Sequence, residues 1–480
     1  PPVYVYLSVP AVAIFGLSEF AVRFPAAVIG VLSVIVVYFL VKEVFDNYDK
    51  KTALWIALVA SFFLAISQWH LQFSRAAFEG NVGIVFLIFS LLCFFKALKS
   101  PKYYLFFTLS FVASIYSYHS FRLINPMIFI ILFVLFWKQI ANQKVWFFSS
   151  VCFVMLLSLP VYWSFIHSQG SSGARLSMVT VFSDQALLAL SAKNVAAAKA
   201  QHNIFGEIVN NRRIIFIPTI VRGYFDHFNF DFLFLHGDGG VQHHAYNMGM
   251  LYLWDFPFIL LGVWFLLRKI NRKIAVLIIL FLLAPLPSAI TTGTPHPVRA
   301  IAMIPGFQIF SAVGIVSLYI WVRKKYTSIS YGVLFCSAAG LMVNVIYYFN
   351  QYYGITPIQY GYFWQYGNKQ ALAYAKKNEE NYAKIIMTYS YDQPYIYYLF
   401  YNKVDPSWYQ KNWNYHGNGE VDRFYRKIGK YEFKNITWSS DSKQKNTLLI
   451  ATPQEIPAVV HVDYEIFFPD GRLAYKIVSL

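Results

Sequence analysis

The stretch FPAAVIGVLSVIVVYFLV, residues 24–41, contains no charged side chain and is followed at once by Lys42 and Glu43. A helix needs about 20 apolar residues to cross the hydrocarbon core of a bilayer, and fewer where neighbouring helices assist. This stretch therefore predicts a membrane-spanning helix. The composition of the whole chain agrees, because 57% of its 480 residues are hydrophobic and 13% are charged, against about 25% charged residues in soluble domains.

Other apolar segments of similar composition follow along the chain, some of them shorter. Together they predict ten spans: Phe24–Val41, Thr52–Gln68, Val82–Phe95, Tyr103–Tyr118, Pro126–Trp137, Trp146–Trp163, Leu251–Leu267, Ile274–Leu286, Ile301–Trp321 and Tyr331–Phe349. Because the backbone must satisfy its own hydrogen bonds in lipid, apolar runs of this kind form helices. We expect a mainly α, polytopic membrane helix bundle over residues 1–349.

The short loops between these spans divide into two sets by charge. One set is rich in basic residues: Lys42, Lys50 and Lys51; Lys96, Lys99 and Lys102; Lys138 and Lys144; Arg268, Lys269, Arg272 and Lys273; Arg323, Lys324 and Lys325. The other set carries single arginines, Arg75, Arg122 and Arg299. Lysine and arginine concentrate in cytoplasmic loops, so the first set predicts the cytoplasmic side. The net charge of +17 then reflects topology in a multi-pass cell-membrane protein rather than nucleic-acid binding.

This alternation places residues 1–23, the long loop 164–250 and the tail 350–480 on the outer side. Within the loop, Gln185–Val209 has helical spacing that suits a helix lying along the membrane surface. The tail predicts a small soluble α/β domain. Its elements are a helix at Gln370–Glu380, strands at Ala383–Thr388 and Thr447–Thr452, and a hairpin from Tyr464–Phe468 and Leu473–Val478 around Pro469-Asp470-Gly471.

Three outer loops each combine one arginine with a second ionisable residue. The pairs are Arg75 with Glu79, His119 with Arg122, and His296 with Arg299. At spacings of four and three, the two members of each pair would share a face if the loop were helical. Arginine binds phosphate through two parallel hydrogen bonds. We therefore expect the three loops to converge on an anion-binding site outside the bilayer.

Simpler interpretations of these residues remain open. Each arginine could be an interfacial anchor, Arg75 and Glu79 could form a structural pair, and the histidines could tie loops together. His236, Asp238, His243 and His244 have ligand chemistry, but the adjacent histidines point in different directions on a regular element. We favour a structural loop there, and we expect no metal site and no required cofactor, although a divalent metal stays possible. The three cysteines lie in apolar segments without ligand spacing.

The N-terminal sequence resembles a known enzyme class. PPVYVYL at residues 1–7, FGLSEFAVRFPAA at 15–27, FSRAAFE at 73–79, YHSFR at 118–122 and TPHPVR at 294–299 are together similar to GT-C glycosyltransferases. Within that class the chain resembles bacterial members of the superfamily of protein O-mannosyltransferases and lipid A aminoarabinose transferases. The resemblance runs over about residues 1–325.

The resemblance implies an enzyme that transfers a hexosyl or pentosyl group from a polyprenyl-phosphate donor to an acceptor on the outer face. The acceptor would be a protein, a lipid A-like glycolipid or a glycan. It also implies one more helix upstream of Pro1, followed by a loop with the acidic catalytic base. Among the residues present, Glu79 becomes a catalytic candidate, although many relatives carry aspartate there. Arg75, His119, Arg122, His296 and Arg299 become substrate-binding candidates.

A transporter or flippase of lipid-linked sugars is the alternative interpretation. The same outer arginines would then hold a lipid phosphate without chemistry. Transporters often show paired repeats and broken helices at the bilayer midplane, whereas here the sequence shows no evident repeat and its polar residues cluster at one face. These features favour an enzyme.

Overall fold

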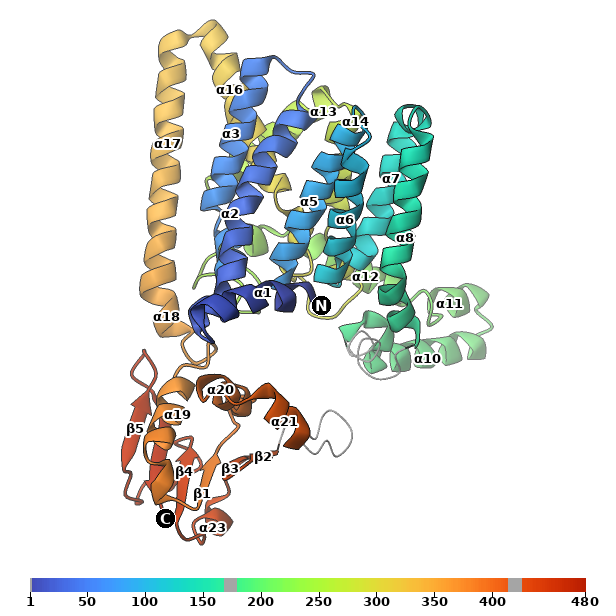
Figure 1. Cartoon of the computed structure of the whole chain (residues 1–480). Coiled ribbons are helices and arrows are strands. Elements are labelled where there is room, and N and C mark those ends of the chain that lie inside the picture. The colour runs from blue at the N-terminus through green and yellow to red at the C-terminus, as the bar shows by residue number, and fades with distance from the viewer. Residues whose placement is uncertain (1, 168–178, 413–424) are drawn as a thin grey trace. The chain divides into compact units, whose positions relative to one another are not determined.

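The computed structural model describes residues 2–167, 179–412 and 425–480. The chain folds into two compact units. The first unit comprises Pro1–Ala11 and Val22–Tyr348, and the second comprises Val12–Ala21 and Phe349–Leu480. Figure 1 shows the first unit as a helix bundle and the second as a sheet with helices.

Helices occupy all ten predicted spans. In chain order the helices that lie wholly or partly in the first unit are α1 (Pro2–Phe15), α2 (Glu19–Val44), α3 (Lys50–Ile66), α4 (Gln68–Arg75), α5 (Glu79–Ala97), α6 (Tyr103–Ser117), α7 (Phe121–Ala141), α8 (Lys144–His167), α10 (Gln185–Ala200), α11 (Ile204–Val209), α12 (Phe216–Asp226), α13 (Asp255–Arg268), α14 (Arg272–Leu283), α15 (Leu286–Ala289), α16 (Gly306–Lys325) and α17 (Thr327–Phe349). The short helices η1 (Val181–Ser183), η2 (Asp231–Leu235) and η3 (Ile301–Met303) lie between them. The helical interpretation of the apolar runs is confirmed.

The number of full-length spans is smaller than the predicted ten. Within the described residues, seven helices or joined helices are long and apolar enough to cross a membrane, and the bent pair α3–α4 makes eight. The segments predicted at Tyr103–Tyr118 and Leu251–Leu267 form helices of 15 and 14 residues. Such helices are shorter than the bilayer core requires, so they depend on their neighbours for burial.

The break between α3 and α4 is occupied by buried polar side chains. The two helices meet at Ser67 with a bend of 55°. His70 Nε2 lies 2.7 Å from Ser33 Oγ on α2 and 3.3 Å from Ser74 Oγ. Asn81 Nδ2 on α5 donates to Ser74 Oγ at 3.0 Å. These hydrogen bonds join α2, α4 and α5, which satisfies polar groups that would otherwise be costly inside the bundle.

Four of the basic loops meet in the folded bundle. Lys273 Nζ, before α14, bonds to Glu43 Oε1 at 2.8 Å and Asp46 Oδ2 at 2.7 Å after α2. Lys99, after α5, bonds to the same two carboxylates at 2.8 and 3.2 Å. Arg272 NH1 donates to Gln139 at the end of α7. These loops therefore lie at one end of the bundle, as the charge pattern predicted.

Helices α13 and α16 approach so closely that glycine is required on both. A Cβ atom on Gly262 would lie 1.8 Å from the Phe310 carbonyl oxygen, and one on Gly314 would lie 2.1 Å from that of Phe258. Small residues allow such backbone contact between membrane helices. The two helices are therefore packed through their backbones.

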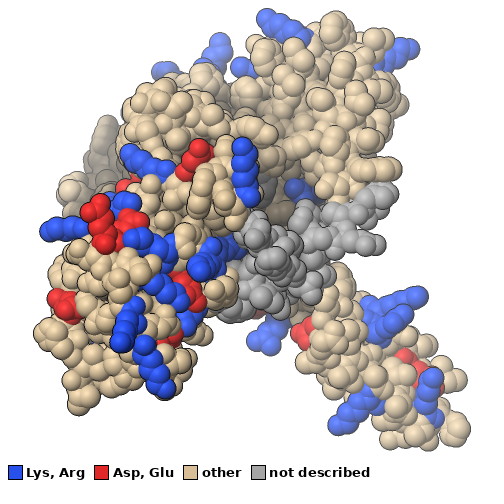
Figure 2. Space-filling model, turned by 60° about the horizontal axis from the view of Figure 1, so that its bottom comes forward, with Lys and Arg blue, Asp and Glu red and all other residues tan. Residues whose placement is uncertain are grey.

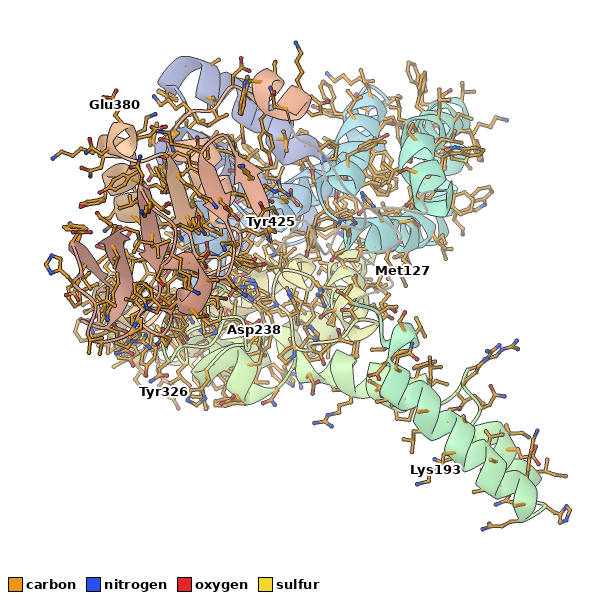
Figure 3. All side chains as sticks on the ribbon, turned by 90° about the horizontal axis from the view of Figure 1, so that it is seen from below. Met127, Lys193, Asp238, Tyr326, Glu380 and Tyr425 are labelled. Atoms are coloured by element: carbon orange, nitrogen blue, oxygen red, sulfur yellow. The ribbon has the colours of Figure 1, made fainter. Side chains whose placement is uncertain are left out.

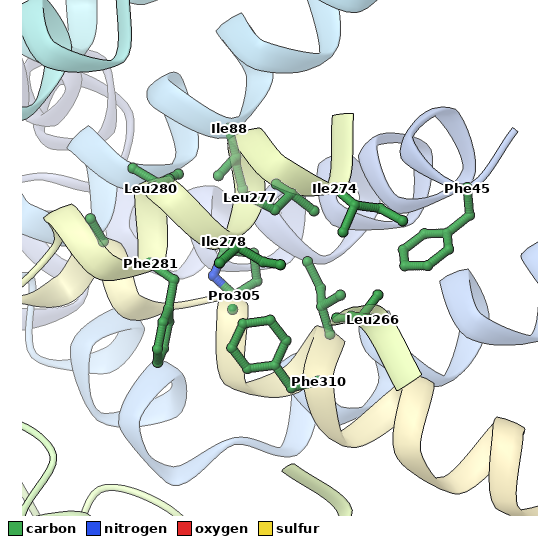
Figure 4. A pocket seen from close by; sticks show the side chains of 13 residues that line it. Phe45, Ile88, Leu266, Ile274, Leu277, Ile278, Leu280, Phe281, Pro305 and Phe310 are labelled. Atoms are coloured by element: carbon green, nitrogen blue, oxygen red, sulfur yellow. The ribbon is translucent and has the colours of Figure 1, made fainter. Parts of the chain in front are cut away.

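A pocket between α13, α14 and α16 is lined only by apolar residues (Figure 4). Phe45, Leu266 and Ile274 close it on the side of the basic loops, and Phe281, Pro305 and Phe310 line the rest. Without a polar or ionisable lining side chain, this pocket offers no group for binding an anion or moving a proton. The candidate site therefore lies elsewhere.

The second unit contains a mixed sheet of six strands in the order β2-β3-β1-β4-β6-β5. The strands are β1 (Lys384–Met387), β2 (Arg426–Ile428), β3 (Tyr431–Phe433), β4 (Thr447–Ala451), β5 (Tyr464–Phe467) and β6 (Leu473–Ser479), and β1 runs parallel to β3 and β4. The helices of the unit are α18 (Thr356–Gln359), α19 (Asn368–Lys377), α20 (Pro394–Tyr401), α21 (Pro406–Asn412) and α23 (Trp438–Asp441), with η4 (Asn350–Ile355) and η5 (Glu379–Asn381).

The predicted elements of this domain are confirmed: α19, β1, β4 and the antiparallel pair β5–β6 lie where the sequence placed them. Strands β2 and β3, each of three residues, and helices α20, α21 and α23 were missed, because such short elements give no periodic pattern. Buried side chains on both faces of the sheet, such as Ile385 on one and Ile386 on the other, form the core.

Candidate active site

The three arginine-bearing loops converge in the first unit. Helix α5 begins beside the first loop, and a Cβ atom on Gly80 would lie 3.3 Å from Val298 of the third loop. A Cβ atom on Gly83 would lie 2.3 Å from the ring of Phe121, which follows the second loop. Tyr118 of the second loop is near enough to Arg299 to act on its charge. The start of α5 thus packs against both other loops.

None of the three residue pairs lies within one regular helix, so the condition under which the members of a pair would share a helical face is not met. Helix α4 ends at Arg75 and α5 begins at Glu79, with Ala77 between them at a φ of 62°. His119 lies in the turn before α7, whereas Arg122 is the second residue of that helix. The third pair is in the loop between α15 and η3. Each pair brackets a change of chain direction.

The sequence-predicted residues differ in exposure. The side chains of Arg75 and His119 are exposed, and those of Glu79, Arg122, His296 and Arg299 are half-buried. Within the described residues, Nε of Arg122 and Nδ1 of His296 are buried without a hydrogen-bond partner. Buried polar atoms in this state normally find a partner. Each of the two atoms thus keeps a hydrogen-bonding capacity that no described residue satisfies.

Arg299 is held by its own loop. Its NH1 group donates to Thr291 Oγ1 at 2.6 Å and to the Thr292 carbonyl at 2.8 Å. Both bonds start from one guanidinium nitrogen. These bonds to the described residues therefore leave the N–H groups of the other guanidinium nitrogens for a ligand. Burial lowers the pKa of Arg299, but a guanidinium stays charged in proteins. The side chain is a fixed positive charge.

Helix α12 fixes the loop that carries His296. The Thr294 hydroxyl donates to Asp226 Oδ2 at 2.9 Å, and the backbone N–H of His296 donates to Nε2 of His227 at 3.1 Å. The other ring nitrogen of His227 donates to the Gly223 carbonyl at 2.8 Å. These bonds set the orientation of the His227 ring and position His296. His227 and Asp226 were not among the residues singled out from the sequence.

A second imidazole from the long outer loop lies against His296. The rings of His243 and His296 are 5.0 Å apart between centroids, and His243 also contacts Phe73 and Phe78 of the first loop. Asp238 Oδ2 accepts from His243 Nδ1 at 2.7 Å, and both side chains are almost fully buried. Gln72 of α4 donates to the Gln242 carbonyl. The long loop is therefore joined to the first and third loops.

The cluster His236, Asp238, His243 and His244 holds the loop together. His244 Nε2 bonds to the Asp238 carbonyl at 2.9 Å, while His236 pairs with Asp231 instead. Within the described parts of the chain, no group of three or more His, Cys, Asp or Glu side chains is arranged to bind a metal ion. The side chains that the sequence marked as metal-like form hydrogen bonds within the protein.

One helix N-terminus adds to the positive character of this end. Helix α5 begins at Glu79 without a side-chain cap, whereas the first N–H groups of α7 donate to the carbonyls of Tyr118, His119 and Ser120. The first N–H groups of a helix lack partners within it and carry a partial positive charge, which favours an anion. Together with Arg75, Arg122 and Arg299, the start of α5 makes this end suitable for binding a phosphate group. Figure 3 views this end from below, with Asp238 labelled.

Burial lowers the pKa of His296 to about 3, and the neighbouring Arg299 charge acts in the same direction. In the unfolded chain the pKa of His296 is near 6.5. Between pH 6.5 and 3 the unfolded chain therefore binds a proton at His296, whereas the folded protein keeps this side chain neutral. Stability from this group is complete above pH 6.5 and is lost as the pH falls towards 3, by up to about 1.4 kcal/mol per pH unit. We expect the melting temperature in detergent to fall over this range.

The His296→Gln variant should reduce that slope by about one proton, whereas His202→Gln, at an exposed position, should leave it unchanged. The residual slope would come in part from His227, whose pKa burial also lowers. An unaltered slope in His296→Gln would contradict the neutral state of this ring.

The N-terminal third of the chain is similar to a known protein family. Residues 1–163 match the family described as dolichyl-phosphate-mannose-protein mannosyltransferase, which confirms the resemblance read from the sequence for this third of the chain. No curated protein matches the chain by sequence.

Several solved structures are similar to this one. The oligosaccharyltransferase of Archaeoglobus fulgidus in complex with Zn and sulfate has 17% identity and a TM-score of 0.47, with 81% of this chain and 52% of that chain covered. AglB from the same organism, with an inhibitory peptide and a dolichol-phosphate, has 15% identity and a TM-score of 0.45 (81% and 54% covered). ArnT from Cupriavidus metallidurans has 11% identity and a TM-score of 0.49 (99% and 87% covered). This chain spans about half the length of the oligosaccharyltransferases.

Proposed function

Because residues 1–163 match the dolichyl-phosphate-mannose-protein mannosyltransferase family, we propose that this protein is an integral membrane glycosyltransferase. It takes a hexosyl or pentosyl group from a polyprenyl-phosphate donor and transfers it to an acceptor at the outer face of the cell membrane. The acceptor is a protein, a lipid A-like glycolipid or a glycan. The observation that carries the proposal is the convergence of three arginine-bearing loops at the start of helix α5.

The reaction exchanges one bond for another at the anomeric carbon. The acceptor's nucleophile forms a bond to that carbon as the bond to the phosphate oxygen breaks, and the electron pair leaves on the phosphate. Negative charge therefore grows on the phosphate in the transition state. Preorganised donors aimed at such a charge contribute most to catalysis. Arg75, Arg122 and Arg299 are proposed to hold the phosphate, and the reaction as proposed requires no cofactor.

The remaining candidates have polar roles beside the phosphate. His119 and His296 are proposed to donate hydrogen bonds to the phosphate or the sugar. Glu79 is proposed to position the acceptor or donor, at the first residue of α5. The Asp238–His243 pair is proposed to hold the His296 ring in position, because the rings of His243 and His296 are in contact. A carboxylate near the acceptor would take its proton.

The test is a reconstituted assay that separates transfer from transport. Full-length protein in liposomes receives polyprenyl-phosphate mannose or polyprenyl-phosphate aminoarabinose labelled in both sugar and lipid. A transferase releases free polyprenyl phosphate in proportion to sugar bound by the acceptor fraction. The flippase alternative instead moves the intact lipid-linked sugar between leaflets. Translocation without release of polyprenyl phosphate would overturn the proposal.

The proposed orientation can be tested by labelling single cysteines in intact cells. In a variant without Cys93, Cys152 and Cys336, cysteine at Lys50 or Arg272 should resist a membrane-impermeant maleimide. Cysteine at Lys193 or Lys443 should react. All four positions are exposed on the protein, so only the membrane decides the result. Reaction at Lys50 or Arg272 in unbroken cells would reverse the orientation.

A further inference from the structure

Helices α10 and α11 form a firmly built hairpin. Ser191 Oγ donates to the Asn210 carbonyl at 2.6 Å, and Asn194 Nδ2 donates to Asn210 Oδ1 at 3.1 Å. Asp184 caps the start of α10, and Asn203 caps the start of α11. The polar groups between the two helices are thus satisfied inside the hairpin. The outward-facing side chains of the hairpin take no part in these hydrogen bonds.

Those side chains are apolar to an unusual degree. On α11, Ile204 is 73% exposed, Phe205 75% and Ile208 55%. Leu190 on α10 and Val209 at the end of α11 are also exposed. Figure 3 shows the hairpin, marked by Lys193, extending away from the rest of the bundle. Apolar groups gathered on such a projection mark an interaction with a partner or a membrane.

The base of the hairpin is fixed where a membrane span ends. Thr180 pairs with Thr291 as an antiparallel bridge, and the Val181 N–H donates to the Ile290 carbonyl. The span Arg272–Ala289 ends directly before these residues. In Figure 1, α10 runs crosswise to the spanning helix α8. The hairpin therefore starts at the depth of a membrane interface and runs along it.

Helix α12 also exposes an apolar face. Ile217, Val221 and Phe225 are all exposed and lie four residues apart, so they share one face of the helix. The opposite face packs on the loop after α15, where Gly223 meets Thr294. One face of α12 thus packs against the protein, and the other exposes apolar side chains.

Basic residues accompany this surface. Between residues 179 and 230 the chain has five basic residues (Lys193, Lys199, Arg212, Arg213, Arg222) and three acidic ones (Asp184, Glu207, Asp226), a difference of +2. Asp184 and Asp226 are engaged in hydrogen bonds to backbone N–H groups and to Thr294. Figure 2 shows the projecting hairpin as largely uncharged surface that carries Lys and Arg side chains together with some Asp and Glu. This is the composition of helices that lie in a membrane interface.

We propose that the α10–α11 hairpin is a membrane-docking arm that binds an anionic lipid surface. The side chains of Ile204, Phe205 and Ile208 enter the boundary between headgroups and acyl chains, to a depth of about 5–10 Å. Lys199, Arg212 and Arg213 contact the lipid phosphates. The arm thereby holds the long outer loop, and with it His227 and His243, at a fixed height above the bilayer.

The first test measures the surroundings of the arm in single-copy nanodiscs of phosphatidylcholine and phosphatidylglycerol. An environment-sensitive dye is placed at Phe205→Cys in full-length protein without the native cysteines. Two controls use Lys443→Cys, which is exposed on the second unit, and Phe335→Cys, which is 74% exposed on spanning helix α17. We expect aqueous iodide to quench the dye at 205 several-fold less than at 443. Lipids spin-labelled near the headgroup should quench 205 more than 335.

Equal iodide quenching at 205 and 443 would overturn the proposal. Shielding of 205 in crowded vesicles but not in single-copy nanodiscs would also overturn it, because the partner would then be a second copy of the chain.

The second test separates charge from apolar insertion. Replacing Lys199, Arg212 and Arg213 together with glutamine should bring shielding in anionic nanodiscs down to that in pure phosphatidylcholine. Each basic residue near an anionic surface changes partitioning by about fivefold. The matched control replaces Lys427, Lys443 and Lys445, exposed lysines of the second unit. Unchanged shielding in the hairpin variant would refute the anionic-lipid part of the proposal.

Discussion

The Arg299→Ala variant is expected to lose about a hundred- to a thousandfold in turnover of the polyprenyl-phosphate sugar. Removing one preorganised donor to a developing negative charge costs about 2.7–4 kcal/mol in the transition state. Arg75→Ala and Arg122→Ala should behave alike if they hold the same phosphate. Lysine at each position should recover only part of the loss, because an ammonium lacks the planar fork. The measurement is turnover per folded molecule.

A structural role for Arg299 predicts a different outcome. Its NH1 bonds to Thr291 and Thr292 could serve only to shape the loop. The Thr291→Val variant removes one of these bonds and keeps the guanidinium, so it should reduce the melting temperature but retain most turnover. If the lysine variants match the parent at all three arginine positions, the arginines are interfacial anchors and the phosphate site is wrong.

The Gly262→Ala variant is expected to prevent normal assembly of the bundle. A Cβ atom there would meet the Phe310 carbonyl oxygen at 1.8 Å, and a backbone atom cannot move aside as a side chain can. The two helices must therefore separate, and this costs at least as much as ordinary overpacking, which is roughly 1–3 kcal/mol. The separation also removes the close contact that holds membrane helices together. We expect aggregation in size-exclusion chromatography and a much lower melting temperature.

Gly332 offers a matched control. It lies in the helix α17, and a Cβ atom there would meet nothing within 4 Å. Gly332→Ala should leave the protein intact and even stabilise it slightly, by roughly 0.5–1 kcal/mol, because alanine loses less conformational freedom in a helix. Normal behaviour of both alanine variants would show that α13 and α16 are not packed through their backbones.

Apolar runs and loop charges predicted the bundle well, because lipid leaves a chain few alternatives to helices. They could not give the length of each helix. The segment Tyr103–Tyr118 has the composition of a membrane span, yet its helix has 15 residues. The domain of residues 350–480 was predicted where periodic elements exist, as in β4 and β6. Strands β2 and β3 were missed, because three residues are too few to show a period of two and because β3 also depends on pairing with β1, which is distant in the sequence.

The candidate site was predicted in part for a similar reason. The arginines and histidines at the ends of apolar runs were visible, since a charge there stands out from its surroundings. Their geometry was not, because helical spacing was assumed across Ala77, where the chain reverses with a positive φ. The contact of His243 with His296 joins residues far apart in the chain, and no local sequence pattern predicts such a contact. Asp226 followed by His227 was a signal that could have been weighed.

The ion pairs of Glu43 have a consequence for the order of synthesis. Lys99 follows Glu43 by 56 residues and Lys273 follows it by 230. At a translation rate of about 5–20 residues per second, Lys273 is made about ten to fifty seconds after its partner. Lys99, which bonds to both carboxylates in the folded protein, is made earlier within that interval. The cluster of Glu43, Asp46, Lys99 and Lys273 therefore cannot be complete until the start of α14 has been synthesised.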